Sequence, residues 1–183
     1  MRLFLAVFPP PEVQRAAAAV SDALRRPGDG VSWVKADNLH FTMRFLGELG
    51  ESGAKRAAQA ADRAAAKHRV FQATLGAPGA FPRPAKARVL WLGIEGGATE
   101  LETLARDLEA ELRAQGFDRA DHKFTAHLTL GRVRERDQDW SDRLAAVRVE
   151  PLSFAVDRIR LIESTLSPKG SRYDTRAEAR LPS

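Results

Sequence analysis

Two short patterns in the sequence combine residue types that can do acid–base chemistry. Each is a histidine followed two positions later by a threonine: His40 with Thr42, and His127 with Thr129. Both lie in stretches whose alternating apolar residues predict β-strands, in which alternate side chains share a face. Imidazoles titrate near about pH 6.5, so two of them can serve as base and acid, while hydroxyls donate to anionic oxygens. Two such pairs facing each other would suit transfer at a phosphoryl centre.

The same two strands carry arginines that can stabilise negative charge developing on a phosphoryl group. In NLHFTMRFLG, residues 38–47, a period of two places Arg44 on the face of His40 and Thr42, with apolar side chains on the other face. Arg132 ends the second strand and is the stronger candidate. We therefore expect Arg132 to bind substrate, and the role of Arg44 stays open.

The chain repeats itself around these patterns. A strand at residues 3–7, a helix stripe within residues 13–24 and the first histidine pattern recur in the same order 87 or 88 residues later. This predicts an α+β fold in which residues 1–183 form a single bilobal domain. The two lobes would be antiparallel-sheet units related by an approximate twofold axis, with helices outside and a central cleft between them.

The remaining elements follow from periodicity and from helix and strand breakers. Further strands are expected at residues 31–34, 69–76, 87–96, 152–164 and 172–181, the last at a sheet edge. Further helices are expected at residues 53–68, with Ser52 as a cap, and at 98–115 and 138–146. A proline- and glycine-rich loop at 77–86 is expected to be the hinge between lobes.

Composition sets outer limits on function. The 183 residues are 44% hydrophobic, enough for a core, and include no cysteine, which excludes disulfides, thiol nucleophiles and thiolate metal sites. No apolar stretch approaches the roughly 20 residues that span a bilayer, so we expect a soluble cytoplasmic protein. The net charge of +5 suits a polyanion such as RNA, although many arginines can simply form solvated helix faces.

Other residues that invite a functional interpretation are better explained by packing. Two histidines 87 residues apart lack the third and fourth ligands of a metal site, so no metal or cofactor is expected. His68 and His122 are expected to be ordinary surface residues. The tryptophans are expected to pack in or around the core, and Tyr173, which could reach a ligand, is also expected to pack. The tryptophans are Trp33, Trp91 and Trp140.

These blocks together resemble a known family, the two-histidine (2H) phosphoesterases. The similarity runs nearly end to end and is specific to the bacterial and archaeal RNA 2′,3′-cyclic phosphodiesterases, once called 2′-5′ RNA ligases. Four stretches carry it: RLFLAVFPP, WVKADNLHFTMRFLGEL, AHLTLGRV and LIESTLSPKGSRYD. The two HxT motifs lie at residues 40–43 and 127–130.

The resemblance implies a bilobal, metal-independent enzyme that hydrolyses RNA 2′,3′-cyclic phosphate ends to 2′-phosphomonoesters. It implies that His40 is the proton donor and His127 the proton acceptor, with the threonine two residues after each histidine binding the phosphate. Family members often have proline just before the second histidine and arginine before that. This chain has Ala126 and Thr125 there, which changes local backbone rigidity and one possible RNA contact.

The motifs leave other activities open. A relative with the same core can act on 2′-5′-linked oligonucleotides, on a cyclic phosphate of ADP-ribose, or as a reversible 2′-5′ RNA ligase for tRNA halves. A different class of function is a basic RNA-binding module whose histidine patterns bind phosphate without turnover. In each case the expected partner is RNA or a nucleotide, such as RNA ending in a 2′,3′-cyclic phosphate or tRNA fragments, and the protein is expected to be a monomer away from membranes.

Overall fold

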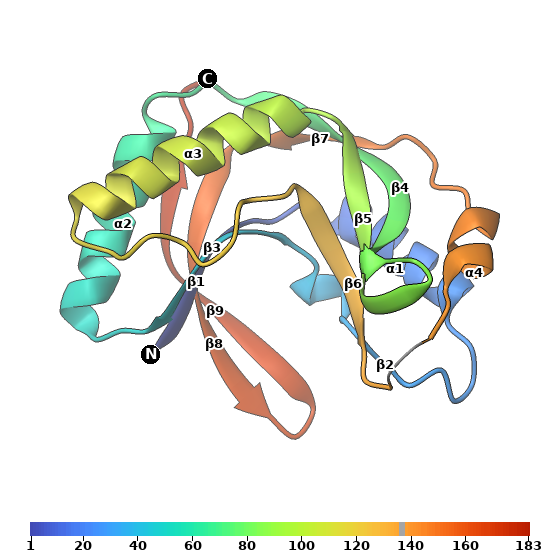
Figure 1. Ribbon diagram of the computed structural model, residues 1–183. Coiled ribbons are helices and arrows are strands. Elements are labelled where there is room, and N and C mark those ends of the chain that lie inside the picture. Colours follow the sequence, from blue (N-terminus) through green and yellow to red (C-terminus); the bar gives the residue numbers. More distant parts are fainter. Residues whose placement is uncertain (136–137) are drawn as a thin grey trace.

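The computed structural model describes residues 1–135 and 138–183. Figure 1 shows helices arranged around a strongly curved sheet. The helices are α1 (Pro11–Leu24), the short 3-10 helix η1 (Ala36–Asn38), α2 (Glu51–Ala65), α3 (Ala98–Ala114) and α4 (Ser141–Ala146). The strands are β1 (Arg2–Val7), β2 (Val31–Trp33), β3 (Phe41–Glu48), β4 (Phe71–Arg83), β5 (Lys86–Gly96), β6 (His127–Val133), β7 (Ser153–Val156), β8 (Arg158–Ser167) and β9 (Gly170–Arg180).

The strands form one antiparallel sheet with two halves. Their order is β7-β4-β5-β6-β3-β1-β8-β9, and β2 pairs with β6 outside this path. The halves meet where β3 lies beside β6. Each half runs from a first strand through a helix to a histidine strand: β1, α1 and β3 in one, and β5, α3 and β6 in the other. The predicted α+β fold of two antiparallel units is confirmed, with both units joined in a single sheet.

The contact between β3 and β6 shows how the halves are related. Phe41 lies opposite Leu128 across the two strands. These residues occupy the same position in the two motifs, 87 residues apart. In an antiparallel pair, equivalent residues can face each other only where a twofold axis passes between them. The Phe41–Leu128 pair therefore marks the approximate twofold axis of the sheet.

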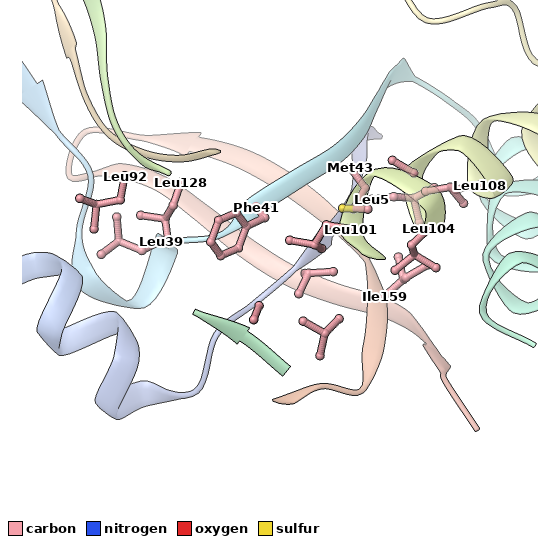
Figure 2. Close-up of a cluster of buried hydrophobic side chains, with 14 of the residues drawn as sticks. Leu5, Leu39, Phe41, Met43, Leu92, Leu101, Leu104, Leu108, Leu128 and Ile159 are labelled. Atoms are coloured by element: carbon pink, nitrogen blue, oxygen red, sulfur yellow. The ribbon is translucent and has the colours of Figure 1, made fainter. Parts of the chain in front are cut away.

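One face of the sheet packs against helices to form the core. The stripe predicted for α3 is fully buried, and most of the stripe predicted for α1 is buried with it. Figure 2 shows leucines of α3 against side chains from both histidine strands and from β1, β5 and β8. The labelled residues are Leu5, Leu39, Phe41, Met43, Leu92, Leu101, Leu104, Leu108, Leu128 and Ile159. Burial of these apolar side chains fixes which face of each strand points away from the helices.

The repeat in the sequence corresponds to a repeat in the structure, but the first strands of the two halves, β1 and β5, align differently from the prediction. Leu5 pairs with Arg44 in one half, and Leu90 pairs with Gly131, the counterpart of Arg44, in the other. Leu5 and Leu90 are therefore equivalent, an offset of 85 residues and not 87. A two-residue slip leaves every side chain on its original face, so hydrophobic alternation does not reveal it.

The prediction that residues 77–86 form a hinge loop is wrong. Most of this segment continues β4, which pairs with β5 as far as Arg83 opposite Lys86. The prolines are tolerated because the pairing is irregular beside Pro78 and Pro82, and because β7 covers the outer edge of β4 only at residues 71–74. A proline nitrogen facing an uncovered edge removes no ladder hydrogen bond.

The segment expected as one strand at residues 152–164 is two strands. Its first part, β7, pairs with β4, whereas β8 pairs with β1 and β9. The chain thus passes at Asp157 from one end of the strand order to the strand next to the other end, which requires the sheet to curl. Figure 1 shows β8 and β9 projecting as a long hairpin beyond the rest of the sheet, with β9 at the edge as predicted.

Smaller differences concern helix ends. The alanine-rich helix α2 begins at Glu51 after Gly50, so Ser52 lies inside its first turn and is not its cap. The helix expected at residues 138–146 is shorter, beginning at Ser141. Within residues 1–135 and 138–183, no helix has the length and apolar character needed to cross a membrane.

Candidate active site around two histidines

The side chains next to the axial Phe41–Leu128 pair form the candidate site. Because Phe41 and Leu128 point into the core, their neighbours on each strand point away from it. These neighbours are His40, Thr42, His127 and Thr129, and we call the side of the sheet that they share the histidine face. At such a crossing the two histidines are diagonal neighbours, whose main chains are about 7–8 Å apart. The two rings are close enough for the charge of His127 to lower the pKa of His40.

Both imidazole rings are oriented in the same way by the main chain. Nδ1 of His40 lies 2.6 Å from the carbonyl oxygen of Asn38, and Nδ1 of His127 lies 2.8 Å from that of Thr125. A carbonyl only accepts, so in each ring Nδ1 carries the hydrogen and donates it. Nε2 is then the basic, hydrogen-bond-accepting nitrogen of each neutral imidazole. Nε2 of His40 is 2.9 Å from the hydroxyl of Thr42.

Aromatic rings enclose His40. Phe4 and Phe8 both stack on its ring with centroids at 5.0 and 5.2 Å, and Tyr173 approaches edge-on at 5.5 Å. This burial lowers the pKa of His40 to about 4 against the hydrogen bond to Asn38, and the positive charges of His127 and Arg132 lower it further. In the free protein His40 is therefore neutral at pH 7.

His127 has a similar but more open environment. Phe81 meets its ring edge-on at 5.1 Å, and Phe81 in turn packs on Trp91. Burial lowers the pKa of His127, the hydrogen bond to Thr125 opposes this, and the charge of Arg132 lowers it further. Because the charge of Arg132 lowers the pKa of both histidines, its guanidinium lies close to both rings.

The expectation that Arg44 shares the face of His40 is wrong, because β3 contains a bulge. Ala6 pairs with Thr42 but Leu5 pairs with Arg44, so Met43 has no partner on β1 and the alternation of faces is interrupted. Phe45, opposite Phe4, returns to the histidine face, where its side chain is 61% exposed and 6.0 Å from the Phe4 ring.

The side chain of Arg44 instead lies on the helix-covered side of the sheet. Its side chain is only 11% exposed, and its Nε lies 3.1 Å from a carboxylate oxygen of Glu109 on α3. It also donates to the carbonyl oxygen of Asp118. These contacts tie β3 to α3 and to the chain that follows it. The counterpart of Arg44 is Gly131, where a Cβ atom would come within 2.7 Å of Val31 on β2.

A matching bulge explains the position of Arg132. Trp91 pairs with Thr129 and Leu90 pairs with Gly131, so Leu130 is the unpaired residue. After this bulge Arg132 returns to the histidine face, opposite Val89. Simple alternation from Thr129 would place Arg132 on the core side. The structure therefore brings Arg132 to the two histidine patterns, as its prediction as a substrate-binding residue requires.

Sequence reasoning missed the aromatic residues that enclose His40. Their signal was present in the first strand, where alternate positions of RLFLAVFP carry Phe4, Ala6 and Phe8 on one face. Ala6 pairs with Thr42, which places this stripe beside the first motif. Without the pairing of β1 with β3, the stripe is indistinguishable from a second core-facing surface.

The remaining predicted residues behave as follows. Trp140 is buried and Trp33 packs on it, as expected, while Trp91 lies on the histidine face opposite Thr129. His122 is exposed as predicted. His68, in contrast, is largely covered, with its Nε2 2.7 Å from a carboxylate oxygen of Asp107 on α3. Over the described part of the chain, no three histidine and acidic side chains gather as metal ligands would.

A duplicated antiparallel sheet that presents an HxT motif from each half at a common axis defines a two-histidine phosphoesterase. A model of the 2′-5′ RNA ligase superfamily matches residues 9–167. The chain belongs to this family.

Relatives of similar length share both the sequence and the fold. The RNA 2′,3′-cyclic phosphodiesterase of Thermotoga maritima is 34% identical over 94% of this chain and 91% of its own length. The RNA 2′,3′-cyclic phosphodiesterase of Archaeoglobus fulgidus is 35% identical over 94% of this chain and 96% of its own length. Escherichia coli LigT, solved in complex with 3′-AMP, has a TM-score of 0.79 at 28% identity, covering 100% of this chain and 98% of LigT. A Thermus thermophilus protein of known structure has a TM-score of 0.78 at 32% identity, covering 99% of this chain and 98% of the Thermus protein.

Proposed function

We propose that this protein hydrolyses RNA 2′,3′-cyclic phosphate ends to 2′-phosphomonoesters by acid–base catalysis at His40 and His127. The observation that carries the proposal is the arrangement of two imidazoles, two hydroxyls and Arg132 about the Phe41–Leu128 axis. Relatives at similar length bear the name of this activity. The substrate is RNA with a cyclic phosphate end, including tRNA fragments or nucleotides, and we expect a cytoplasmic monomer.

The proposed reaction is an in-line displacement at phosphorus. Nε2 of His127 takes a proton from water, whose oxygen forms a bond to phosphorus as the bond to the 3′ oxygen breaks. Nε2 of His40 gives its proton to that leaving oxygen, and the phosphate stays on the 2′ oxygen. Acid and base on opposite sides of phosphorus each contribute roughly 10²–10⁴-fold in rate.

The other site residues hold the phosphate. We expect the hydroxyls of Thr42 and Thr129 to donate to the two non-bridging oxygens, one from each half of the sheet. The Thr42 hydroxyl becomes available for this when Nε2 of His40 is protonated and no longer accepts its hydrogen. The guanidinium of Arg132 stabilises the negative charge that grows on these oxygens. The phosphodiester also supplies the charge that His40 needs. Its single negative charge between the rings favours the protonated imidazole and opposes the effect of burial on the pKa of His40.

The proposal is tested with adenosine 2′,3′-cyclic phosphate in the presence of EDTA. We expect turnover to persist and the product to be the 2′-monophosphate. His40→Ala and His127→Ala should each lose at least about 10²-fold in kcat, while His122→Ala, at an exposed position outside both motifs, serves as the control. Full activity in either motif variant would contradict the proposal. Binding of RNA without turnover would favour the non-catalytic RNA-binding module.

The roles of the two histidines are separated by changing the leaving group. A substrate with sulfur at the 3′ bridging position releases a thiolate, which needs no proton from an acid. On this substrate His40→Ala should recover most of the activity of the unmodified protein, and His127→Ala should not. The reverse pattern would exchange the two roles. This matters because the low pKa of His40 in the free protein does not by itself make it the acid.

The family model also names a second candidate, 2′-5′ RNA ligation. The same site would perform it if the 5′ hydroxyl of a second RNA replaced water, with His127 taking the hydroxyl proton. The bond to the 3′ oxygen then breaks and a 2′-5′ linkage remains. Incubation of a cyclic-phosphate oligonucleotide with a 5′-hydroxyl oligonucleotide distinguishes the activities, because ligation lengthens the labelled strand and hydrolysis does not. Cleavage of a synthetic 2′-5′ linkage tests the reverse reaction.

A further inference from the structure

The end of the β8–β9 hairpin extends beyond the sheet beside the first histidine. β1 pairs with β8 only as far as Glu163, so residues 164–173 continue as a two-stranded ribbon, which we call the arm. Figure 1 shows the arm projecting on the side of the sheet away from α2 and α3. Tyr173 at the base of the arm contacts His40, with ring centroids 5.5 Å apart. The arm therefore borders the histidine face on the side of His40.

Hydrogen bonds of Asn38 join the arm to the first motif. The side-chain amide of Asn38 donates to the carbonyl oxygen of Ser171 at 2.8 Å, and its own carbonyl oxygen accepts from Nδ1 of His40 at 2.6 Å. Ser171 is two residues from Lys169, which is roughly 7 Å along a strand. The tip of the arm is therefore held in a fixed relation to His40.

The turn of the arm presents Lys169. The hydroxyl of Ser167 donates to the carbonyl oxygen of Gly170 at 2.7 Å and accepts from the main-chain N–H of Lys169 at 3.3 Å. Gly170 has a φ of 109°, in the left-handed region that favours glycine. The side chain of Lys169 is exposed. The turn therefore places a positive charge at the tip of the arm.

A second lysine reaches the same tip from another part of the chain. Lys35 lies between β2 and η1, where the N–H of Val34 donates to the carbonyl oxygen of Leu130 at 2.8 Å and holds this segment against the second histidine strand. The Lys35 side chain is exposed and extends towards the arm, so that a Cβ atom at Gly170 would lie 3.9 Å from its Cε atom. The two lysines therefore meet where the arm approaches the other half of the sheet.

The two lysines differ from their neighbours in having no acidic partner. Within residues 1–135 and 138–183, neither Lys35 nor Lys169 forms an ion pair. Asp37, two residues after Lys35, lines a cavity beside the turn between β1 and α1. Four arginines of the β8–β9 hairpin do contact carboxylates, namely Arg158, Arg160, Arg172 and Arg176. The lysines are therefore available to an anion from outside the protein.

Arg132 adds a third positive charge between the tip of the arm and the histidines. Burial raises the pKa of Tyr173 and the charge of Arg132 opposes this, which places the guanidinium near the base of the arm as well as near both histidines. Positive charge thus extends from the reacting centre to the tip of the arm. Lysines and arginines arranged along a surface in this way bind successive phosphates of a nucleic acid.

We propose that Lys35 and Lys169 bind the backbone phosphate on the 5′ side of the terminal nucleotide, so that the protein prefers the end of an RNA chain to a free cyclic nucleotide. This inference rests on the proposed function, in which the 3′ oxygen leaves towards His40. The nucleoside that carries this oxygen then lies on the side of His40, and the preceding nucleotides lead away over the arm. Arg132 binds the reacting phosphate and the two lysines bind the next one.

The test removes charge from the substrate and from the protein separately. Two dinucleotide substrates end in a 2′,3′-cyclic phosphate and differ only in the internucleoside link, which is a phosphodiester in one and an uncharged methylphosphonate in the other. In the unmodified protein, kcat/KM should be at least about fivefold higher for the phosphodiester, the effect of two exposed ion pairs. The double variant Lys35→Gln with Lys169→Gln should bring this ratio close to one. Lys35→Arg with Lys169→Arg should keep it.

The matched control removes two exposed positive charges from α2, by Lys55→Gln with Arg63→Gln. This control should keep the ratio of the unmodified protein, because α2 lies on the other side of the sheet from the arm. A ratio close to one in the unmodified protein would overturn the proposal. So would an equal loss of the ratio in the control, which would mean that net charge and not the arm selects the substrate.

Calorimetry separates these outcomes from failure of the proposed function, because it needs no turnover. The ligands are the two dinucleotides ending in a 2′-monophosphate, again with a phosphodiester or a methylphosphonate link. If the charged ligand binds at least about fivefold more tightly and the double glutamine variant removes the difference, the lysine site stands even in a protein that hydrolyses no cyclic phosphate. If the two ligands bind the unmodified protein equally, the lysine site fails whatever the activity.

Discussion

The enclosure of His40 by aromatic rings should make the stability of the protein depend on pH in a predictable way. Folding lowers the pKa of this imidazole from 6.5 to about 4. The folded state therefore resists protonation, so the stability that the neutral ring contributes is complete above pH 6.5 and is lost as the pH falls towards 4. By linkage, the loss reaches up to about 2 kcal/mol at pH 5 and about 3 kcal/mol once the folded form is also protonated.

His40→Gln removes this titration while keeping a polar side chain of similar size. Urea unfolding of both proteins at pH 7.5 and pH 5 gives the free energy of unfolding in each case. The difference between the two proteins should change by about 2 kcal/mol in favour of His40→Gln on moving to pH 5. His122→Gln, at an exposed position, controls for general effects of acid. A change below about 0.5 kcal/mol would refute the burial of a neutral imidazole at His40.

Three further outcomes follow from the site and the sheet. The pKa of both motif histidines is lowered from 6.5, so the alkaline limb of kcat/KM should fall below pH 6.5; a limb above pH 7 would contradict this. Arg44→Met should cost about 2 kcal/mol in urea unfolding by leaving Glu109 without its arginine partner, with kcat/KM unchanged because Arg44 faces α3; a selective loss of kcat/KM would place it in the site instead. Gly131→Ala should lower the free energy of unfolding by roughly 1–3 kcal/mol, since its Cβ would approach Val31 to 2.7 Å. An unchanged midpoint of urea unfolding would show that β2 can move away without cost.

Most residues of the candidate site could be selected from the sequence, because the two histidine patterns are short and each lies along one strand. Their mutual placement followed from the repeat. What alternation does not reveal is a bulge. One extra residue at Met43 exchanges the faces of Arg44 and Phe45, and the extra residue at Leu130 brings Arg132 to the histidine face. Bulges arise from pairing between strands, which no single-strand pattern records.

The hinge prediction failed for a related reason. Prolines and glycines at residues 77–86 are typical of loops because they disrupt hydrogen-bonded ladders. Whether they do so depends on which edge of the strand is paired, and this is set by the distant strand β7, which covers only residues 71–74 of β4. The division of residues 152–164 at Asp157 likewise depends on closure of the whole sheet. Local sequence carries neither fact.

The hydrogen bonds from Nδ1 of each histidine to a main-chain carbonyl have a consequence for how such a site can evolve. The carbonyls belong to Asn38 and Thr125, which have different side chains but make the same bond at 2.6 and 2.8 Å. Which nitrogen of each ring carries the hydrogen is thus determined by the path of the backbone and not by the side chain at position 38 or 125. Those two positions are free to acquire other duties, as Asn38 has done by donating to the carbonyl oxygen of Ser171 and anchoring the β9 hairpin. The two halves of the sheet could therefore diverge in sequence beside the two histidines without losing the orientation of either ring.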